Sequence, residues 1–368
     1  MGKSLIALAL GLGMAATAQA TYVGDFGASG QATVTPVIVA GAPPDSPAAR
    51  VDPNVLTSPF TGVVSINIRY IDQATGQQLS FICSGTAITP WHVLTAGHCV
   101  DSVGNGTVVD ITKPGNDVRV VVNDSDPFTS ATDLITANQV TINPNYDGFN
   151  ICPDGSSDCL NDDIAIIRLD RALPTTTQVY QIYDQPVDPG TVFTMVGYGL
   201  SGDGINGYTV NPSFFVKRAG ANVFDLFDTN DEQGFSATSP REVWYYDFDG
   251  TKNGVNRDTF CLLGLACSAQ LPNNVETHLG GGDSGGASFV LTSSGYQLVA
   301  NNTFGINFHY GTDVTSGDFG DAGGGILLYS YLDWIRATAV PEPNSLALFA
   351  FGLLAVTAIG RRKAKTRR

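Results

Sequence analysis

Short runs rich in β-branched residues, separated by Gly, Asn and Asp, dominate the hydrophobic pattern of the chain. Six of these runs predict strands, at 62–69, 81–88, 118–122, 164–169, 192–196 and 297–300. The segments between these runs show no long helical period and no internal repeat. One amphipathic helix is predicted at 328–337, where Leu328, Leu332 and Ile335 share a face. Short strands between turn residues favour an all-β sandwich or barrel.

The N-terminal segment has the pattern of a secretory signal. Residues 1–20 combine Lys3, an apolar run at 5–14 and a small-residue cleavage site, Ala-Gln-Ala, at 18–20. Residues 21–50 are rich in Ala, Gly, Pro and Thr, and we expect a poorly ordered leader or propeptide there.

The C-terminal segment has three parts. Pro-Glu-Pro at 341–343 precedes an uncharged run at 345–360 and a basic tail at 361–368. Sixteen helical residues span about 24 Å, just short of a full bilayer core, and the basic tail favours the cytoplasmic side. A plain membrane anchor is one interpretation. The segment 340–368 also resembles the PEP-CTERM sorting signal of Gram-negative bacteria. That resemblance implies an exosortase-type partner, transient membrane contact and export, with release or surface attachment left open.

Charge limits the classes of partner. The chain has 368 residues, a formal charge of −15 and a pI near 4.4. The terminal segments hold seven of the 19 basic residues, so the part between carries about −21. Such a surface repels phosphate backbones and argues against nucleic acid as a partner. The length is sufficient for a large core.

Six cysteines agree with export, because disulfides persist in oxidising compartments. Their spacing suggests three local pairs in sequence order, among 15 connectivities. They are Cys83, Cys99, Cys152, Cys159, Cys261 and Cys267. No spacing matches a zinc site with histidines, and we predict no metal at the reactive centre.

Three short motifs carry reactive side chains. They are Leu-Thr-Ala-Gly-His-Cys at 94–99, Asp-Ile-Ala-Ile-Ile-Arg-Leu at 163–169 and Gly-Asp-Ser-Gly-Gly at 282–286. The order His98, Asp163, Ser284 in one exported, β-rich chain resembles the trypsin-like (chymotrypsin-fold) serine proteases. The resemblance implies an all-β fold of two six-stranded antiparallel Greek-key barrels with a short C-terminal helix, within a peptidase domain at 51–339.

Further segments extend the resemblance. The strand at 81–88 is similar to the one before the family's catalytic His, which implies a Cys83–Cys99 bridge. Gly-Tyr-Gly at 197–199 resembles the start of the second barrel, and 331–335 resembles the C-terminal helix. The edge that pairs with the substrate backbone would contain Thr303, Phe304 and Gly305.

The resemblance assigns a role to each motif. A Ser hydroxyl needs a base within hydrogen-bond reach, and a His suits that work near neutral pH. His98 would activate Ser284, and Asp163 would fix the imidazole tautomer. Backbone N–H groups of Gly282 and Ser284 would form the oxyanion hole. Asp162 is the rival of Asp163, which directly abuts the apolar strand.

Asp283 has a second role in the family, because it pairs with a new α-amino group after zymogen cleavage. A buried carboxylate without a cation is costly. Val51, which follows Arg50 and precedes His98 by 47 residues, is the first candidate for that new terminus. Ile38, which opens Ile-Val-Ala-Gly, is the alternative.

The specificity pocket departs from the family pattern. His278 stands six residues before Ser284, where trypsin has Asp, and Gly280 stands where a Cys is usual. A preference for Arg or Lys therefore does not follow. His278 would either favour an acidic side chain or serve as a solvent-facing or hydrogen-bonded filler.

An acidic loop offers oxygen ligands. Asp247, Asp249, Asn253, Asn256 and Asp258 could hold Ca²⁺, although the full EF-hand pattern is absent and a solvated loop is the competing interpretation. No cofactor is expected for catalysis.

The sequence therefore predicts a monomeric exported serine endopeptidase that acts on proteins or peptides through an acyl-enzyme. The alternative is a catalytically silent surface or matrix protein that retains the protease scaffold for binding.

Overall fold

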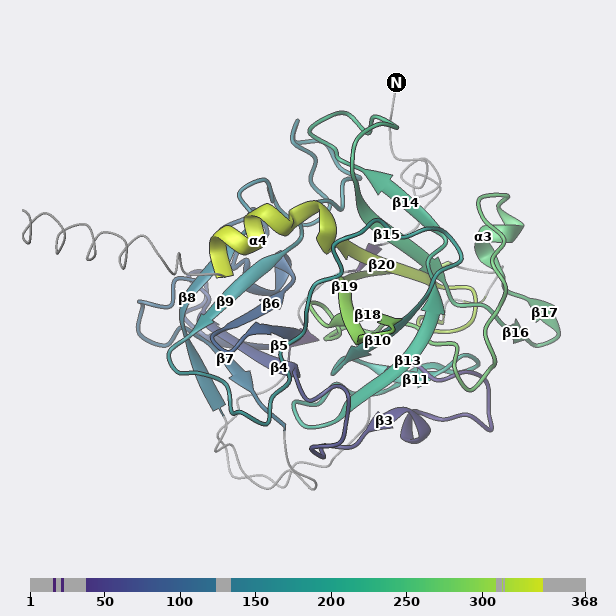
Figure 1. Cartoon of the computed structure of the whole chain (residues 1–368), viewed down its shortest axis with the longest axis horizontal. Helices are drawn as coiled ribbons and strands as arrows, with labels where there is room; N and C mark the ends of the chain where they lie inside the picture. The colour runs from purple at the N-terminus through teal and green to yellow at the C-terminus, as the bar shows by residue number, and fades with distance from the viewer. Residues whose placement is uncertain are drawn as a thin grey trace, which may run out of the picture.

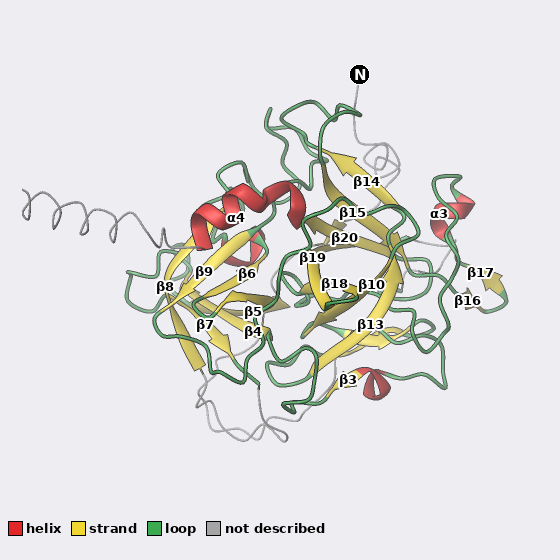
Figure 2. Ribbon diagram, in the orientation of Figure 1, coloured by secondary structure: helices red, strands yellow, loops and turns green. Residues whose placement is uncertain are grey.

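The computed structural model describes residues 16–17, 21–22, 38–123, 134–308, 313 and 315–339. Figure 1 traces these residues along the chain, and Figure 2 shows how strongly strands outnumber helices. Within the described residues, two curved antiparallel sheets lie side by side.

The first sheet closes into a six-stranded barrel. Its strand order is β5-β4-β7-β8-β9-β6, and β6 pairs with β5 to close the ring. Apolar side chains alternate into its interior, as in Val64, Ile66 and Ile68 of β4. The strands are β4 (Val63–Ile71), β5 (Gln78–Thr89), β6 (His92–Thr95), β7 (Asp117–Val121), β8 (Leu134–Ile142) and β9 (Ala165–Leu169).

The second sheet does not close by strand pairing among the described residues, and we refer to this half of the fold as the second barrel. Its order is β14-β15-β20-β19-β18-β10-β13-β3. The side-chain amide of Asn222 on β13 donates to the backbone carbonyl of Asp247 on β15 at 3.0 Å, so these two strands approach each other. The strands are β3 (Val51–Asp52), β10 (Val192–Gly197), β13 (Lys217–Val223), β14 (Leu226–Thr229), β15 (Arg241–Asp247), β18 (Ala287–Thr292), β19 (Gly295–Ile306) and β20 (Ala322–Leu327).

Short strands, two hairpins and short helices complete the described fold. Strands β1 (Ala16–Thr17) and β2 (Thr21–Tyr22) pair with β19 and β5. The hairpins are β11 (Ser201–Asp203) with β12 (Gly207–Val210), and β16 (Thr251–Lys252) with β17 (Val255–Asn256). The helices are η1 (Pro47–Arg50), α2 (Gly97–Val100), α3 (Thr259–Leu262), η2 (Leu328–Tyr331) and α4 (Leu332–Ala339).

The largest apolar core spans both sheets. It joins Leu94 and Ile164 of the first half to Ala287 and Leu298 of the second, and Ile335 of α4 packs against it. Figure 1 shows α4 lying across the strands of the first barrel. This shared core packs the two barrels against each other.

The structure confirms the predicted all-β fold and each of the six predicted strands. The predicted helix is also present, although its first turn is the 3₁₀ helix η2. All three cysteine pairs form in sequence order: Cys83–Cys99, Cys152–Cys159 and Cys261–Cys267.

The prediction of a poorly ordered leader through residue 50 is wrong for residues 38–50. Ile38 and Val39 are fully buried, and Arg50 is only 6% exposed because its guanidinium bonds Asp45. Apolar burial and a buried ion pair offset the low strand propensity of this Pro-rich stretch.

The two expected targeting segments lie almost wholly outside the described residues. Within the described part of the chain, no helix combines the length and apolar character required to cross a bilayer. The predicted span at 345–360 is not among the described residues.

Candidate active site

His98 and Asp163 form a buried pair at the barrel junction. His98 lies on α2, directly after β6, and Asp163 precedes β9, the partner of β6. The Nδ1 atom of His98 is 2.7 Å from Oδ2 of Asp163, and the His98 backbone N–H donates to Oδ1 at 2.8 Å. An ionised carboxylate only accepts, so Nδ1 carries the proton and Nε2 keeps its lone pair.

Gly97 makes this double contact sterically feasible. A Cβ at that position would lie 3.1 Å from Oδ1 of Asp163. Replacement of Gly97 would therefore push the carboxylate away from the histidine.

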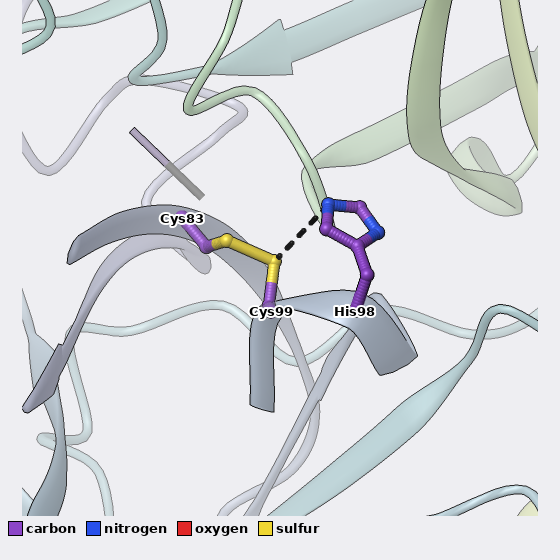
Figure 3. A group of neighbouring side chains, drawn as sticks. All are labelled: Cys83, His98 and Cys99. Carbon is purple, nitrogen blue, oxygen red and sulfur yellow. Dashed lines mark hydrogen bonds between the residues drawn. A yellow bond between two sulfur atoms is a disulfide. The ribbon is translucent and has the colours of Figure 1, made fainter. Parts of the chain in front are cut away.

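Ser284 lies beside this pair. Its carbonyl accepts the Ser84 N–H at 2.8 Å and lies 3.6 Å from Sγ of Cys99. The same sulfur is 3.9 Å from Nε2 of His98, as the dashed line in Figure 3 shows. Among the described residues there is no hydrogen bond between His98 Nε2 and Ser284 Oγ. Such bonds are often loose without substrate and tighten when it binds.

Gly282 and Ser284 present free backbone donors. Neither N–H has an acceptor within the described part of the chain. Gly282 adopts φ +105°, and a Cβ there would lie 2.9 Å from Cα of Gly199. Glycine permits this conformation, which leaves two N–H groups able to meet an oxyanion.

Asp162, the rival aspartate, belongs to a different environment. Its backbone N–H donates to the Tyr331 hydroxyl at 3.1 Å. Burial and then the carboxylates of Glu232 and Glu242 raise the pKa of Asp162 to about 9. Asp162 therefore faces an acidic cluster, whereas Asp163 faces the imidazole.

Asp283 is fully buried and held by backbone donors. Its Oδ1 accepts from Gly199 at 2.7 Å, and its Oδ2 accepts from Gly280 at 2.8 Å. Burial raises the pKa of Asp283 to about 7. Arg218, which is also buried, lowers that pKa through space, but the two do not form an ion pair within the described residues. A direct cationic partner for Asp283 is therefore missing from the described uncleaved chain.

The two candidate activation residues have different surroundings. Val51 is 39% exposed and pairs with Arg218 across the β3–β13 ladder. The backbone carbonyl of Ile38 accepts from the hydroxyl of Ser201, two residues beyond Gly199, which donates to Asp283. Val39 pairs with His278. Ile38 thus lies against the segments that surround Asp283.

His278 is enclosed rather than solvent-facing. It is fully buried, its Nδ1 is 3.0 Å from the Tyr246 hydroxyl, and Phe248 stacks on its ring at 5.7 Å. Burial lowers the pKa of His278 to about 3, which keeps the ring neutral. Its Nε2 has no partner among the described residues, and a Cβ at Gly305 would lie 3.9 Å from it.

The predicted substrate edge lies on β19. Gly305 pairs with Gly323 of β20, and Phe304 is buried in the core shared by the barrels. The hydroxyl of Thr303 is buried without a partner in the described part of the chain. On the described strand β1, Thr17 pairs antiparallel with Gly305, so this edge is able to bind an extended segment.

Sequence reasoning missed several residues of the site. Phe149 stands edge-on to the His98 ring at 5.5 Å, and Asn301 donates to the Asp163 carbonyl at 3.3 Å. The rings of Tyr246 and Tyr208 lie against the ring of His278. None belongs to a local motif, because long-range packing alone brings them to the site.

Comparisons with known proteins find similarity in two stretches of the chain. Residues 57–212 match the Trypsin family model, a stretch that includes His98 and Asp163 and ends before Ser284. Residues 339–363 match the PEP-CTERM protein-sorting motif. Brachyurin of Leptuca pugilator is 31% identical over 125 residues, which are 33% of this chain and 47% of that protein. The chain thus matches about half the length of that curated relative. These similarities are thus to the Trypsin family in the first part of the chain and to a sorting motif near its end.

Proposed function

We propose that the chain is an exported serine endopeptidase that works through His98, Asp163 and Ser284. The observation that carries the proposal is the buried His98–Asp163 pair, whose Nε2 lies 3.9 Å from Sγ of Cys99, the sulfur that is 3.6 Å from the Ser284 carbonyl. The free backbone N–H groups of Gly282 and Ser284 would stabilise the negative charge that develops on the substrate carbonyl oxygen.

The first half of the reaction acylates the serine. Ser284 Oγ attacks the scissile carbonyl carbon while Nε2 of His98 accepts the hydroxyl proton. Charge develops on the carbonyl oxygen, where the two backbone donors stabilise it. Nε2 then returns the proton to the leaving amine as the carbon–nitrogen bond breaks, which leaves an ester on Ser284.

The second half regenerates the enzyme. Water attacks the ester while Nε2 takes one of its protons, and the proton returns to Ser284 Oγ when the acyl group leaves as a carboxylic acid. Asp163 stays ionised throughout and stabilises the imidazolium. No metal or cofactor takes part in the proposed reaction.

We propose an uncharged residue on the acyl side of the scissile bond. Tyr246 Oη accepts from Leu279 and so has its own hydrogen for Nδ1 of His278, which assigns the ring proton to Nε2. A charged side chain would lose its hydration against this neutral, aromatic pocket without gaining an ion pair. A side chain with a hydrogen-bond acceptor would meet the free Nε2–H.

We also propose that Ile38, and not Val51, becomes the mature N-terminus. Arg50 is buried by bonds to Asp45 and to the carbonyls of Val275 and Glu276, so a protease has little access to the bond that follows it. An α-amino group at Ile38 would supply the cation that Asp283 lacks in the described chain.

The sorting motif supports export and a location at the cell surface or outside the cell. An exosortase-type enzyme would then be a processing partner, and transient membrane contact through 345–360 remains part of the proposal. The proposed substrates are proteins or peptides, and the proposed form is a monomer.

Labelling with a fluorophosphonate probe tests the function. The processed chain should label at Ser284 and cleave a mixed peptide pool, and the Ser284→Ala variant should do neither. If the processed chain fails at both while remaining folded, the catalytically silent binding protein becomes the better description.

A further inference from the structure

We propose a Ca²⁺ site in the second barrel, formed by Asp247, Asp249 and Asp258, with Asp225 and Glu276 close to Asp249. The segment that follows β15 carries the β16–β17 hairpin and α3, and we call it the excursion. These carboxylates lie near the point where it leaves the barrel. Figure 1 shows this excursion on the side away from the first barrel. The site is separate from the His98–Asp163 pair and independent of the proposed catalysis.

The distances fit a single cation. Carboxylate oxygens of Asp247, Asp249 and Asp258 all lie within 4.8 Å of one another. Two oxygens bound to one Ca²⁺ at 2.3–2.6 Å are at most about 5 Å apart, so these three can share one ion.

The burial of Asp249 is not explained by a solvated acidic loop. It is 4% exposed, and its Oδ1 has no hydrogen-bond partner among the described residues. Its side chain contributes an oxygen to the cluster with Asp247 and Asp258. An isolated buried carboxylate is costly, so an aspartate held in this way requires a cation or a proton.

Two further carboxylates surround Asp249. Asp225 is 4% exposed and Glu276 is 1% exposed, and both act on Asp249 through space. One oxygen of each accepts a backbone N–H, from Asp247 at 3.2 Å and from Leu271 at 2.7 Å. The other oxygen of each, Oδ1 of Asp225 and Oε1 of Glu276, has no partner in the described part of the chain.

Backbone hydrogen bonds hold the remaining ligands in place. Asp247 Oδ2 accepts the Phe260 N–H at 2.8 Å, and Asp258 Oδ1 accepts the Cys261 N–H at 3.0 Å as the N-cap of α3. No Lys or Arg forms an ion pair with any of the five carboxylates within the described residues. Burial and mutual repulsion raise the pKa of Asp249, as expected for such a set.

The donor set selects Ca²⁺ among common cations. All three clustered ligands are carboxylates, with no His or Cys in the group, which disfavours Zn²⁺. Mg²⁺ prefers a strict octahedron with several waters, whereas Ca²⁺ accepts six to eight oxygens in irregular arrangements. Extracellular modules bind Ca²⁺ with dissociation constants of about 10⁻⁴–10⁻³ M, which suits an exported chain.

Two of the ligands expected from sequence, Asn253 and Asn256, belong to the exposed β16–β17 hairpin. Asp225 and Glu276 approach Asp249 from distant parts of the chain.

Thermal unfolding of the full chain tests the site, with Ser284→Ala present to prevent self-cleavage. At 10 mM CaCl₂ the melting temperature should rise by about 5 °C over the value in EGTA, and MgCl₂ at the same concentration should not reproduce the rise. Asp249→Asn should abolish the response and leave the melting temperature in EGTA unchanged or higher, because it removes a buried charge.

Two matched variants make the result specific. Asp188→Asn, at a 92% exposed side chain, should keep the full response. Asp231→Asn, in the acidic cluster around Asp162, should also keep it. If Asp249→Asn does not fold, Asp225→Asn takes its place. A missing response in the parent chain, a full response in Asp249→Asn, or loss of the response only in Asp231→Asn would overturn the proposal.

Discussion

The carboxylate of Asp163 contacts His98 twice, through Nδ1 at 2.7 Å and through the backbone N–H at 2.8 Å. These two bonds hold both the imidazole ring and the main chain of His98 against the carboxylate of Asp163. The tautomer that leaves Nε2 free is thus a property of the folded chain before any substrate arrives.

Replacement of Asp163 should therefore remove activity without removing the fold. Asp163→Asn should lower kcat/KM for peptide hydrolysis by about 10⁴-fold, because an amide can donate to Nδ1 and so stabilise the wrong tautomer. Steady-state kinetics with circular dichroism as a folding check would measure this. Asp162→Asn is the matched control and should lose little activity, since its carboxylate faces Glu232 and Glu242. Equal losses in the two variants would contradict the assignment.

Asp283 should make the stability of the uncleaved chain depend on pH. Burial raises its pKa to about 7 in the folded state, whereas an unfolded Asp titrates near 3.9. Between these values the folded chain holds a proton that the unfolded chain has lost, so the free energy of unfolding falls as pH rises from about 4 to about 7. The contribution is on the order of 4 kcal/mol.

Asp283→Asn should flatten this part of the pH profile. Urea unfolding of the Ser284→Ala chain at pH 4, 5.5 and 7, with and without Asp283→Asn, would measure the effect. A parallel pair of profiles would show that Asp283 does not carry the dependence.

Local pattern predicted four of the six strands of the first barrel, because each is a contiguous run, and it singled out His98 and Asp163, which the structure brings together. Strands β6 and β8 were not predicted. The strand at 62–69 and the motif around His98 are readable without knowledge of the rest of the chain. Strand β20 was not readable, since three of its six residues are Gly. Its glycines are required by close packing: a Cβ at Gly324 would lie 2.0 Å from the Trp244 carbonyl.

The pocket and the activation segment were harder to predict for a related reason. The neutrality of His278 depends on Tyr246 and Phe248, about 30 residues earlier in the chain. The burial of Arg50 depends on carbonyls near residue 275. Sequence spacing carries no information on such contacts.

The pocket should reject charged side chains on the acyl side of the scissile bond. In a peptide library the processed enzyme should prefer uncharged residues over Arg, Lys, Asp and Glu by at least about 100-fold, because no countercharge offsets desolvation. His278→Ala should weaken any preference for side chains that accept hydrogen bonds. Strong cleavage after Asp or Glu by the parent enzyme would contradict a neutral His278.

Two of the disulfides should differ in their effect on activity. Cys83 and Cys99 are buried and 16 residues apart, so replacing both with Ser should cost about 3 kcal/mol and displace His98. The Cys152–Cys159 bridge closes a seven-residue separation, and its loss should cost about 2 kcal/mol and leave kcat nearly unchanged. Chemical denaturation and kinetics on both double variants would test this order.

N-terminal sequencing of the mature, active protein should begin at Ile38. The chain from Ile38 to Arg50 is packed into the second barrel: Val39 donates to the His278 carbonyl at 3.2 Å, and Arg50 is paired with Asp45. Cleavage before Ile38 frees an α-amino group beside the segments around Asp283, whereas cleavage after Arg50 would detach Ile38 and Val39 from the core.

The Arg50→Gln variant separates the two outcomes. It should lower stability by about 3–5 kcal/mol, because it leaves the buried carboxylate of Asp45 unpaired, yet the mature protein should still begin at Ile38. A mature terminus at Val51 in the parent, lost in Arg50→Gln together with probe labelling, would reverse the assignment.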